Sequence, residues 1–188
     1  IKESDLYNAI NKTKVCTAKN DVRNFLGGIF TKKLEDKILF VSTDGKRLAH
    51  FEVIYGENST SSNDNTILFD CIIPNKTVNE LIRVLKPNNT DNFIQFGKSE
   101  NQLFFKINDN LLLISNIINS TFPDYDKVIP STFTNSVTLY TDNLIKATQQ
   151  ISLLSDKLTQ KIKLNFSNLN NNFKLNMFAA SSDLGDAE

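Results

Sequence analysis

Apolar residues recur at spacings of three and four in three segments, which is the pattern of an amphipathic helix. The first segment covers residues 4–18, and either Ser4 or Asp5 is suited to cap its first turn. The second covers residues 75–87 and ends at a proline, and the third covers residues 141–157. Each segment therefore predicts a helix with one buried face.

Runs of apolar and β-branched residues fill much of the remaining chain and predict antiparallel strands. These runs are residues 25–33, 37–54 and 65–74, three short stretches between 91 and 118, residues 136–140, and a final hairpin at 161–185. A polar loop is expected from 55 to 65. Inside 37–54 the Asp44-Gly45 pair predicts a tight turn, because glycine readily adopts the positive φ that such turns require. The combination predicts an α+β fold.

The order of elements is repeated along the chain. A constant shift aligns residues of the first helix and hairpin with those of the last: Leu6 with Leu144, Ala9 with Ala147, Leu26 with Leu164 and Phe40 with Phe178. A fixed shift of this kind predicts that one structural unit is used more than once. The second copy stops about halfway.

The composition of the chain limits the kinds of ligand and function that can be expected. The 188 residues carry 21 basic and 21 acidic side chains, so any attraction to a polyanion must come from local clusters. Cys16 and Cys71 form no metal-binding pair, and we expect two buried, reduced thiols. No apolar stretch is long enough for a membrane span and no signal peptide is visible, which favours a soluble protein. The first residue is Ile1, which suggests a piece of a longer protein, and the many Asn, Lys, Ile and Phe residues suggest an AT-rich genome.

Enzyme signatures are not found. The single histidine, His50, lies in a predicted strand, and the sequence has no P-loop, zinc-binding or nucleophile-elbow motif. Asp44 is one candidate catalytic carboxylate, but the turn interpretation fits it better. No metal ligand set, cofactor motif or catalytic group is predicted. The chain is therefore interpreted as a binding or scaffold protein.

Four segments, collinear and suitably spaced, together resemble one family. They are "DVRNFLGGIF" (21–30), "VSTDGKRLAHFE" (41–52), "IPNKTVNEL" (73–81) and "FPDYDKVIP" (122–130). In this order they resemble the bacterial DNA sliding clamp, the beta subunit of DNA polymerase III, and the third helix continues the likeness.

The resemblance implies a DNA-clamp fold, with repeated domains of two helices packed on antiparallel sheets. Residues 1–121 would be the complete middle domain, 122–130 an inter-domain linker, and 131–188 a truncated third domain. It implies a non-catalytic processivity factor that encircles duplex DNA as a homodimer in the bacterial cytoplasm, associated with the nucleoid. Its partners would be sequence-independent double-stranded DNA and the polymerase, clamp loader and repair proteins, with no cofactor and no membrane.

The resemblance also implies a set of residues that face DNA with weak, salt-sensitive attraction. They are Lys12, Lys14 and Lys19 around the first helix, Asn20, Arg23, Asn24 and Phe25 in the loop after it, and Lys76, Arg83 and Lys86 on the second helix. Asn24 and Phe25 stand where the family commonly has an aromatic pair. A solvated helix face is the alternative explanation for any one lysine.

A second implied site binds short hydrophobic peptides of partner proteins in a cleft between the middle and third domains. Its residues would be Leu26, Thr43, Gly45, Lys46, Arg47, Leu48, Pro123, Lys127 and Val128. Lys46 and Lys127 replace a histidine and an arginine that the family often has. Lysine keeps the charge but loses the flat bidentate surface, which shifts ligand preference.

Two other functions stay open at this point. An unrelated α+β enzyme would use Asp44 and Arg47 in a cleft and show turnover that Asp44→Ala abolishes. A nucleic-acid binder of another kind would hold linear DNA at moderate salt.

Overall fold

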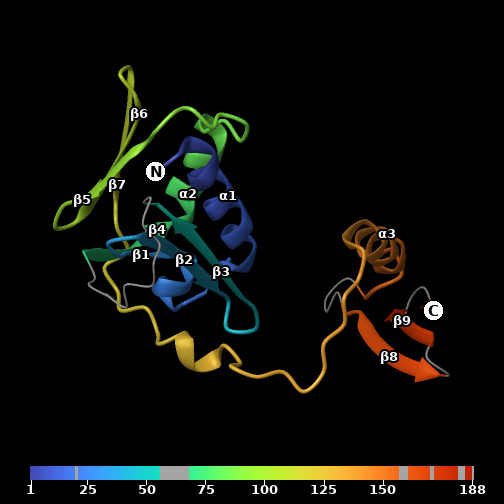
Figure 1. Ribbon diagram of the computed structural model, residues 1–188. Helices are drawn as coiled ribbons and strands as arrows, with labels where there is room; N and C mark the ends of the chain where they lie inside the picture. Colours follow the sequence, from blue (N-terminus) through green and yellow to red (C-terminus); the bar gives the residue numbers. More distant parts are fainter. Residues whose placement is uncertain (20, 56–67, 157–160, 170–171, 182–184, 188) are drawn as a thin grey trace. The chain divides into compact units, whose positions relative to one another are not determined.

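The computed structural model describes residues 1–188 except 20, 56–67, 157–160, 170–171, 182–184 and 188 (Figure 1). The chain divides into two compact units, Ile1–Asp126 and Lys127–Glu188. The boundary falls inside the expected linker. Each unit is described by itself.

The first unit contains two helices and two antiparallel sheets. The helices are α1 (Glu3–Thr13) and α2 (Asn75–Val84), with 3-10 turns η1 (Lys14–Cys16) and η2 (Asn24–Gly27) between α1 and the first strand. The larger sheet has the order β3-β2-β1-β4, from β1 (Gly28–Lys33), β2 (Lys37–Thr43), β3 (Leu48–Ile54) and β4 (Phe69–Pro74). The smaller has the order β5-β6-β7, from β5 (Gln95–Lys98), β6 (Gln102–Asn108) and β7 (Leu111–Asn116).

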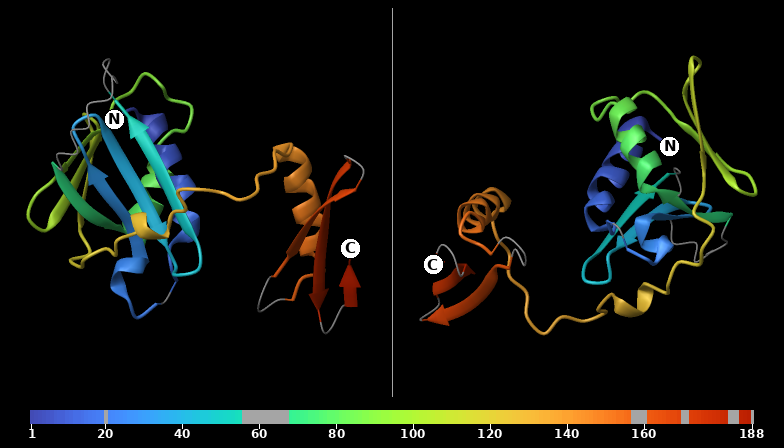
Figure 2. Two further views of the ribbon diagram at one scale, coloured as in Figure 1. Left: turned by 60° about the horizontal axis from the view of Figure 1, so that its bottom comes forward. Right: turned by 180° about the vertical axis from the view of Figure 1, so that it is seen from behind.

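One core joins these layers. Figure 2 shows both helices on the same face of the larger sheet, where α1 contacts β2 and β3 and α2 contacts β1 and β4. The side chains of Leu6, Phe40, Leu81 and Phe105, from two helices and both sheets, are completely buried in a single cluster. Burial of such side chains is worth about 1.5–3 kcal/mol each. The alternating and helical patterns of the sequence therefore meet in one apolar core.

The first unit is built from two similar motifs, each a helix followed by a three-stranded antiparallel meander. The first motif is α1 with β1, β2 and β3, and the second is α2 with β5, β6 and β7. In each motif, the residues that precede the helix form backbone hydrogen bonds with the sheet of the other motif. β4, which precedes α2, pairs with β1. Ile1, which precedes α1, exchanges two backbone hydrogen bonds with Ile94, just before β5.

The second unit repeats this motif once. It contains α3 (Thr141–Ser152) and a sheet of order β10-β9-β8, from β8 (Lys163–Leu169), β9 (Asn172–Ser181) and β10 (Gly185–Ala187). α3 packs on β9. A short 3-10 turn, η3 (Asp126–Val128), spans the boundary between the units.

The α+β, internally repeated fold is confirmed. Both cysteines are free and buried, as predicted, and burial raises the pKa of the Cys71 thiol to about 12. The expected hairpin turn at Asp44-Gly45 is present, with Gly45 at a φ of 85°. The predicted loop at 55–65 lies almost entirely outside the described residues.

Several predicted boundaries are wrong. The first helix ends at Thr13 and the third at Ser152, and the second ends at Val84 because Leu85 is extended before Pro87. The first predicted strand begins only at Gly28, because the residues before it form η2.

The predicted helix cap is also wrong. Ser4 and Asp5 lie inside the first turn of α1, and the N-cap residue, Lys2, makes no side-chain cap. The backbone amides of Glu3 and Ser4 instead donate to the carbonyls of Asn92 and Asn89. A distant loop therefore replaces the local cap.

The predicted strand at 136–140 is not formed. A strand needs a partner to accept its backbone hydrogen bonds, and the three strands of the second unit's sheet pair only with one another.

Candidate functional site

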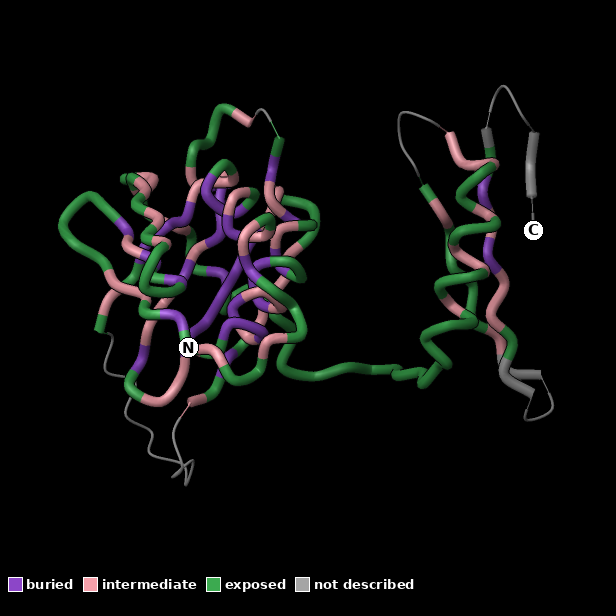
Figure 3. Tube along the Cα trace, turned by 90° about the horizontal axis from the view of Figure 1, so that it is seen from above, coloured by how far each residue is buried: buried purple, intermediate pink, exposed green. Residues whose placement is uncertain are grey.

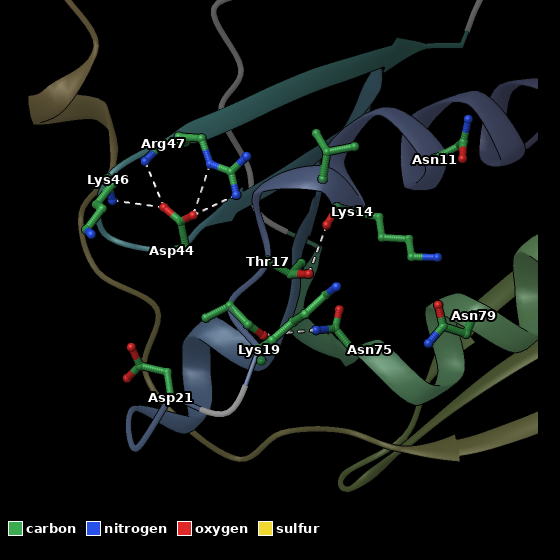
Figure 4. Close-up of a pocket in the computed structure, with 13 residues that line it drawn as sticks. Asn11, Lys14, Thr17, Lys19, Asp21, Asp44, Lys46, Arg47, Asn75 and Asn79 are labelled. Carbon is green, nitrogen blue, oxygen red and sulfur yellow. Dashed lines mark hydrogen bonds and ion pairs between the residues drawn. The ribbon is translucent and has the colours of Figure 1, made fainter. Parts of the chain in front are cut away.

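A wide hollow lies where the end of α1, the loop after it, the β2–β3 turn and the start of α2 meet (Figure 4). Its volume of about 1290 Å³ exceeds the roughly 300–1,000 Å³ of ordinary small-molecule pockets. Most of its lining residues carry polar or charged side chains: Asn11, Lys14, Val15, Thr17, Ala18, Lys19, Asp21, Gly27, Asp44, Lys46, Arg47, Asn75 and Asn79. The hollow therefore suits part of a large polar ligand better than an enclosed small molecule.

The charge in the hollow is positive. Asp44 is paired with Arg47 at 2.9 Å between Oδ2 and Nη2, and Asp21 is paired in the same way with Arg23. Lys14, Lys19 and Lys46 make no ion pair within the described part of the chain. Three uncompensated ammonium groups thus remain beside amide and hydroxyl groups, an arrangement that attracts phosphate.

The β2–β3 turn is held by its own side chains. Asp44 Oδ1 accepts hydrogen bonds from the backbone amides of Lys46 and Arg47, and Oδ2 accepts two from the Arg47 guanidinium. These bonds hold the pKa of Asp44 at about 2. Thr43 Oγ1 donates to the Arg47 carbonyl at 2.7 Å and accepts from the Gly45 amide. An ionised carboxylate engaged in this way is a poor general base, which disfavours the enzyme interpretation.

The loop after α1 is tied to α2 and to η2. The side-chain amide of Asn75, at the start of α2, donates to the carbonyl of Ala18 at 3.3 Å. The backbone amide of Ala18 donates to the carbonyl of Leu26 at 2.9 Å. These bonds hold the loop that carries Lys19, which lines the hollow beside Asn75 (Figure 4).

The residues predicted to face DNA are only partly brought together. Lys14 and Lys19 line the hollow, whereas the Lys12 ammonium lies 5.3 Å from the centre of the Phe51 ring. Asn20 lies outside the described residues. Asn24 is exposed, and the Phe25 ring packs edge-on against Phe122 at 6.2 Å.

The remaining predicted DNA-facing residues lie on and after α2. Lys76 is exposed near its start, and Arg83 is exposed but paired with Glu80 at 3.1 Å. Lys86 is exposed beyond the end of the helix at Val84, so the expected stripe on one helix is wrong at its last position.

An aromatic cluster covers the face of the larger sheet that is turned away from the helices. The Phe122 ring stacks on Phe30 of β1 at 4.8 Å, and the Tyr125 ring lies 6.0 Å from His50 of β3. Tyr125 is buried, and this burial, with smaller effects of nearby carboxylates, raises its pKa to about 12. The aromatic residues of the predicted linker therefore pack on the first unit.

Some of the residues predicted to bind peptides lie on the same sheet face as this aromatic cluster, and the others lie in neighbouring turns or later in the chain. Thr43 pairs with Leu48 across β2 and β3, on the same sheet face as His50 because side chains alternate along a strand. Pro123 is exposed between Phe122 and Tyr125. Three further predicted residues, Gly45, Lys46 and Arg47, lie in the turn that joins this face to the hollow.

The other three predicted peptide-binding residues differ in setting. Leu26 is buried in η2. Lys127 and Val128 follow directly after the first unit, in η3, and Val128 is exposed.

Sequence reasoning missed Asn11, Thr17, Asn75 and Asn79 as lining residues, since single asparagines carry no signal in an asparagine-rich chain. It also missed Phe30 and His50 as the base of the aromatic cluster. The alternation of β1 and β3 could have placed those two side chains opposite the core.

Two absences hold for the described part of the chain. No group of three His, Cys, Asp or Glu residues there could hold a metal ion. None of its helices is long and apolar enough to cross a membrane.

Comparison with known proteins gives a consistent result. Residues 1–124 match the family described as "DNA polymerase III beta subunit, central domain". The beta sliding clamp of Rickettsia bellii is 26% identical over 159 residues, covering 84% of this chain and 40% of that protein. The beta sliding clamp of Synechococcus elongatus is 26% identical over 188 residues, covering 100% of this chain and 48% of that protein.

A solved structure shows the same fold. The crystal structure of the DNA polymerase sliding clamp from Pseudomonas aeruginosa aligns with a TM-score of 0.82 and 24% identity, covering 100% of this chain and 48% of that chain. The chain thus spans less than half the length of each of these relatives.

Proposed function

The chain belongs to the DNA polymerase III beta subunit family, and from this premise we propose that it forms part of a non-catalytic sliding clamp that holds duplex DNA. The observation that carries the proposal is the hollow in which Lys14, Lys19 and Lys46 stand without ion-pair partners in the described chain. In the complete protein, two subunits would close into a ring in the bacterial cytoplasm, associated with the nucleoid.

The chemistry of the hollow supports a sequence-independent contact. Ammonium groups and side-chain amides bind phosphate oxygens, which every duplex presents, and they read no base. Such contacts are weak and salt-dependent, because binding releases counterions from the DNA. A protein that must slide along DNA needs this kind of attraction.

The test is binding of the full chain to a short fluorescent duplex, measured by anisotropy across a salt series. Replacing Lys14, Lys19 and Lys46 by alanine should lower the affinity and flatten the plot of log affinity against log salt, by about 0.9 for each phosphate that is no longer neutralised. The matched control replaces Lys2, Lys98 and Lys106, which lie outside the hollow, by alanine. This triple variant loses the same total charge. Equal effects of the two triple variants would exclude the hollow as the DNA-binding surface.

We further propose that the sheet face bearing Thr43 and Leu48, with Pro123, contributes to a groove for short hydrophobic peptides of the polymerase, clamp loader and repair proteins. Support comes from the family resemblance and from the apolar and aromatic surface around Tyr125. Apolar anchors of a peptide would bury against this surface while the charged turn fixes their position. Lys127 and Val128 are proposed as further contacts.

A short clamp-binding peptide with hydrophobic anchors tests this site by calorimetry. Leu48→Asp should abolish binding, whereas Leu112→Asp, an exposed position on β7, should not. Circular dichroism of both variants separates a binding defect from a folding defect. Unchanged binding by a folded Leu48→Asp variant would reject this face but leave the DNA-binding proposal untouched.

A further inference from the structure

The β2–β3 turn contains a dipeptide that is chemically labile in flexible chains. Among the six glycines of the sequence, Gly45 alone follows an Asp or an Asn. Because glycine has no side chain, its backbone nitrogen is less hindered than that of other residues. Asp44-Gly45 is therefore the position in this chain where a side-chain carboxyl is most open to attack by the next backbone amide.

The reaction at such a pair reroutes the chain through the aspartate side chain. The Gly45 nitrogen bonds to Asp44 Cγ, and the amide proton leaves with a carboxyl hydroxyl as water, which gives a five-membered succinimide ring. Water then opens the ring. Addition at Cγ restores aspartate, whereas addition at the Asp44 backbone carbonyl breaks its bond to the Gly45 nitrogen and gives isoaspartate. One water is released and one is consumed, so no other reactant is needed.

The folded turn holds the attacking nitrogen in its unreactive form. The Gly45 backbone amide donates to Thr43 Oγ1 at 3.0 Å, and the same hydroxyl donates to the Arg47 carbonyl at 2.7 Å. An acceptor on the amide proton favours the protonated nitrogen over the deprotonated nitrogen that attacks. The Thr43 hydroxyl therefore slows the first step.

The carboxyl group is held as well. Asp44 Oδ1 accepts from the backbone amides of Lys46 and Arg47 at 2.9 and 2.8 Å, and Oδ2 accepts from the Arg47 guanidinium at 3.0 and 2.9 Å (Figure 4). Rotation of Cγ toward the Gly45 nitrogen would break these bonds. They also keep the pKa of Asp44 at about 2, and an ionised carboxylate must first take up a proton before an oxygen can leave as water.

The protection comes from these bonds and not from burial in a core. Gly45 is exposed, and the Asp44 side chain is 19% exposed beside an Arg47 side chain that is 64% exposed. The tube in Figure 3 shows how far buried and exposed segments alternate along the first unit. An exposed turn opens more readily than the core strands that flank it, so its own hydrogen bonds set how often the pair becomes reactive.

We propose that Asp44-Gly45 is a site of isoaspartate formation that the folded β2–β3 turn holds in check through Thr43 and Arg47. Isomerisation would lengthen the backbone of the turn by one methylene group and break the bonds that position Lys46 and Arg47. Both of these residues line the hollow, so one isomerised residue would move part of its basic lining. This chemistry depends on the turn alone and not on the ligand that the hollow binds.

Ageing of the purified 188-residue chain at neutral pH, with and without urea, tests the proposal. Isoaspartate is counted by methyl transfer with an isoaspartyl methyltransferase and located by mass spectrometry of peptides. In urea, isoaspartate should accumulate first at Asp44. In the folded chain, it should accumulate there at least about ten-fold more slowly, because several hydrogen bonds must break before attack.

Variants identify the groups that protect the pair. Thr43→Val in the folded chain should raise the rate about two- to ten-fold, the equivalent of one hydrogen bond, whereas Thr43→Ser keeps the hydroxyl and should stay slow. Arg47→Ala frees Asp44 Oδ2 and should also raise the rate. The matched control is Thr90→Val, an exposed threonine in the loop after α2, which should age like the unchanged chain. Circular dichroism confirms that each variant is folded.

Three outcomes would overturn the proposal. Equal rates at Asp44 in the folded and urea-treated chains would show that the turn gives no protection. Isoaspartate at other positions in urea, with Asp44 unchanged, would remove the site. Folded Thr43→Val and Arg47→Ala variants that both age like Thr90→Val would show that these side chains do not hold the pair in check.

Discussion

The carboxylate of Glu3 should contribute more to the stability of the first unit than most of its polar groups. It is 2% exposed and accepts three hydrogen bonds, from the backbone amide of Lys86 at 2.7 Å and from the side-chain amides of Asn89 and Asn92 at 2.8 and 2.9 Å. Together with two backbone bonds to the same loop, it fastens the first turn of α1 to the chain after α2.

Glu3→Ala removes the acceptor and leaves three partly buried donors. Each unsatisfied donor costs about 1–3 kcal/mol when water cannot reach it, and the three share one carboxylate, so their contributions do not simply add. We expect a loss of about 3 kcal/mol in the free energy of unfolding. Glu3→Gln keeps the shape and one oxygen acceptor, and about 1–2 kcal/mol should be lost.

Urea denaturation of the full chain, followed by far-ultraviolet circular dichroism, measures the effect, and hydrogen exchange of the α1 amides locates it. The matched control is Glu35→Ala, an exposed glutamate between β1 and β2, which should change stability by less than about 0.5 kcal/mol. If Glu3→Ala lowered the free energy of unfolding no more than Glu35→Ala, or if the α1 amides kept their full protection from exchange, the Glu3 carboxylate would not be what holds α1 to the loop after α2.

Two further predictions concern a close strand contact and a turn. Gly28→Ala would place a methyl group against the carbonyl oxygen of Ile73 on β4, and we expect a loss of about 1–3 kcal/mol in urea denaturation. Gly27→Ala, where no atom lies within 4 Å, should be close to neutral, and equal losses would contradict the geometry. Because the folded pKa of Asp44 is about 2, below its ordinary 3.8, its stabilisation is complete above about pH 4 and lost as the pH falls through 2. An NMR titration of the Asp44 carboxyl checks this, and a midpoint near 3.8 would contradict it.

The core of the fold could be predicted because burial leaves a local pattern. Leu6 and Ala9 recur at helical spacing, and Phe40 stands in an apolar run, so near neighbours alone assign each residue to its element. The repeat is also visible in the sequence, since Leu6 and Leu144 occupy equivalent positions in α1 and α3.

The rest depends on residues far apart in the sequence. Glu3 resembles an ordinary acidic residue of a first helical turn, but its partners are 83 to 89 positions away. Residues 136–140 have a strand pattern, yet a pattern cannot supply the partner that a strand requires. In the hollow, family resemblance indicates Lys19, whereas Asn75 is a lining residue only because β4 brings the start of α2 to that place.

The hydrogen bonds between Ile1 and Ile94 affect when the first unit can fold as it leaves the ribosome. They join residues 93 positions apart, so the sheet of the second motif gains its added chain segment from a part of the unit that leaves the ribosome much earlier. The sheet of the first motif must in turn wait for β4. Neither motif can complete its hydrogen bonding before most of the unit has emerged, and contacts of such long range slow folding. We therefore expect the first unit to fold as a whole, late in its translation.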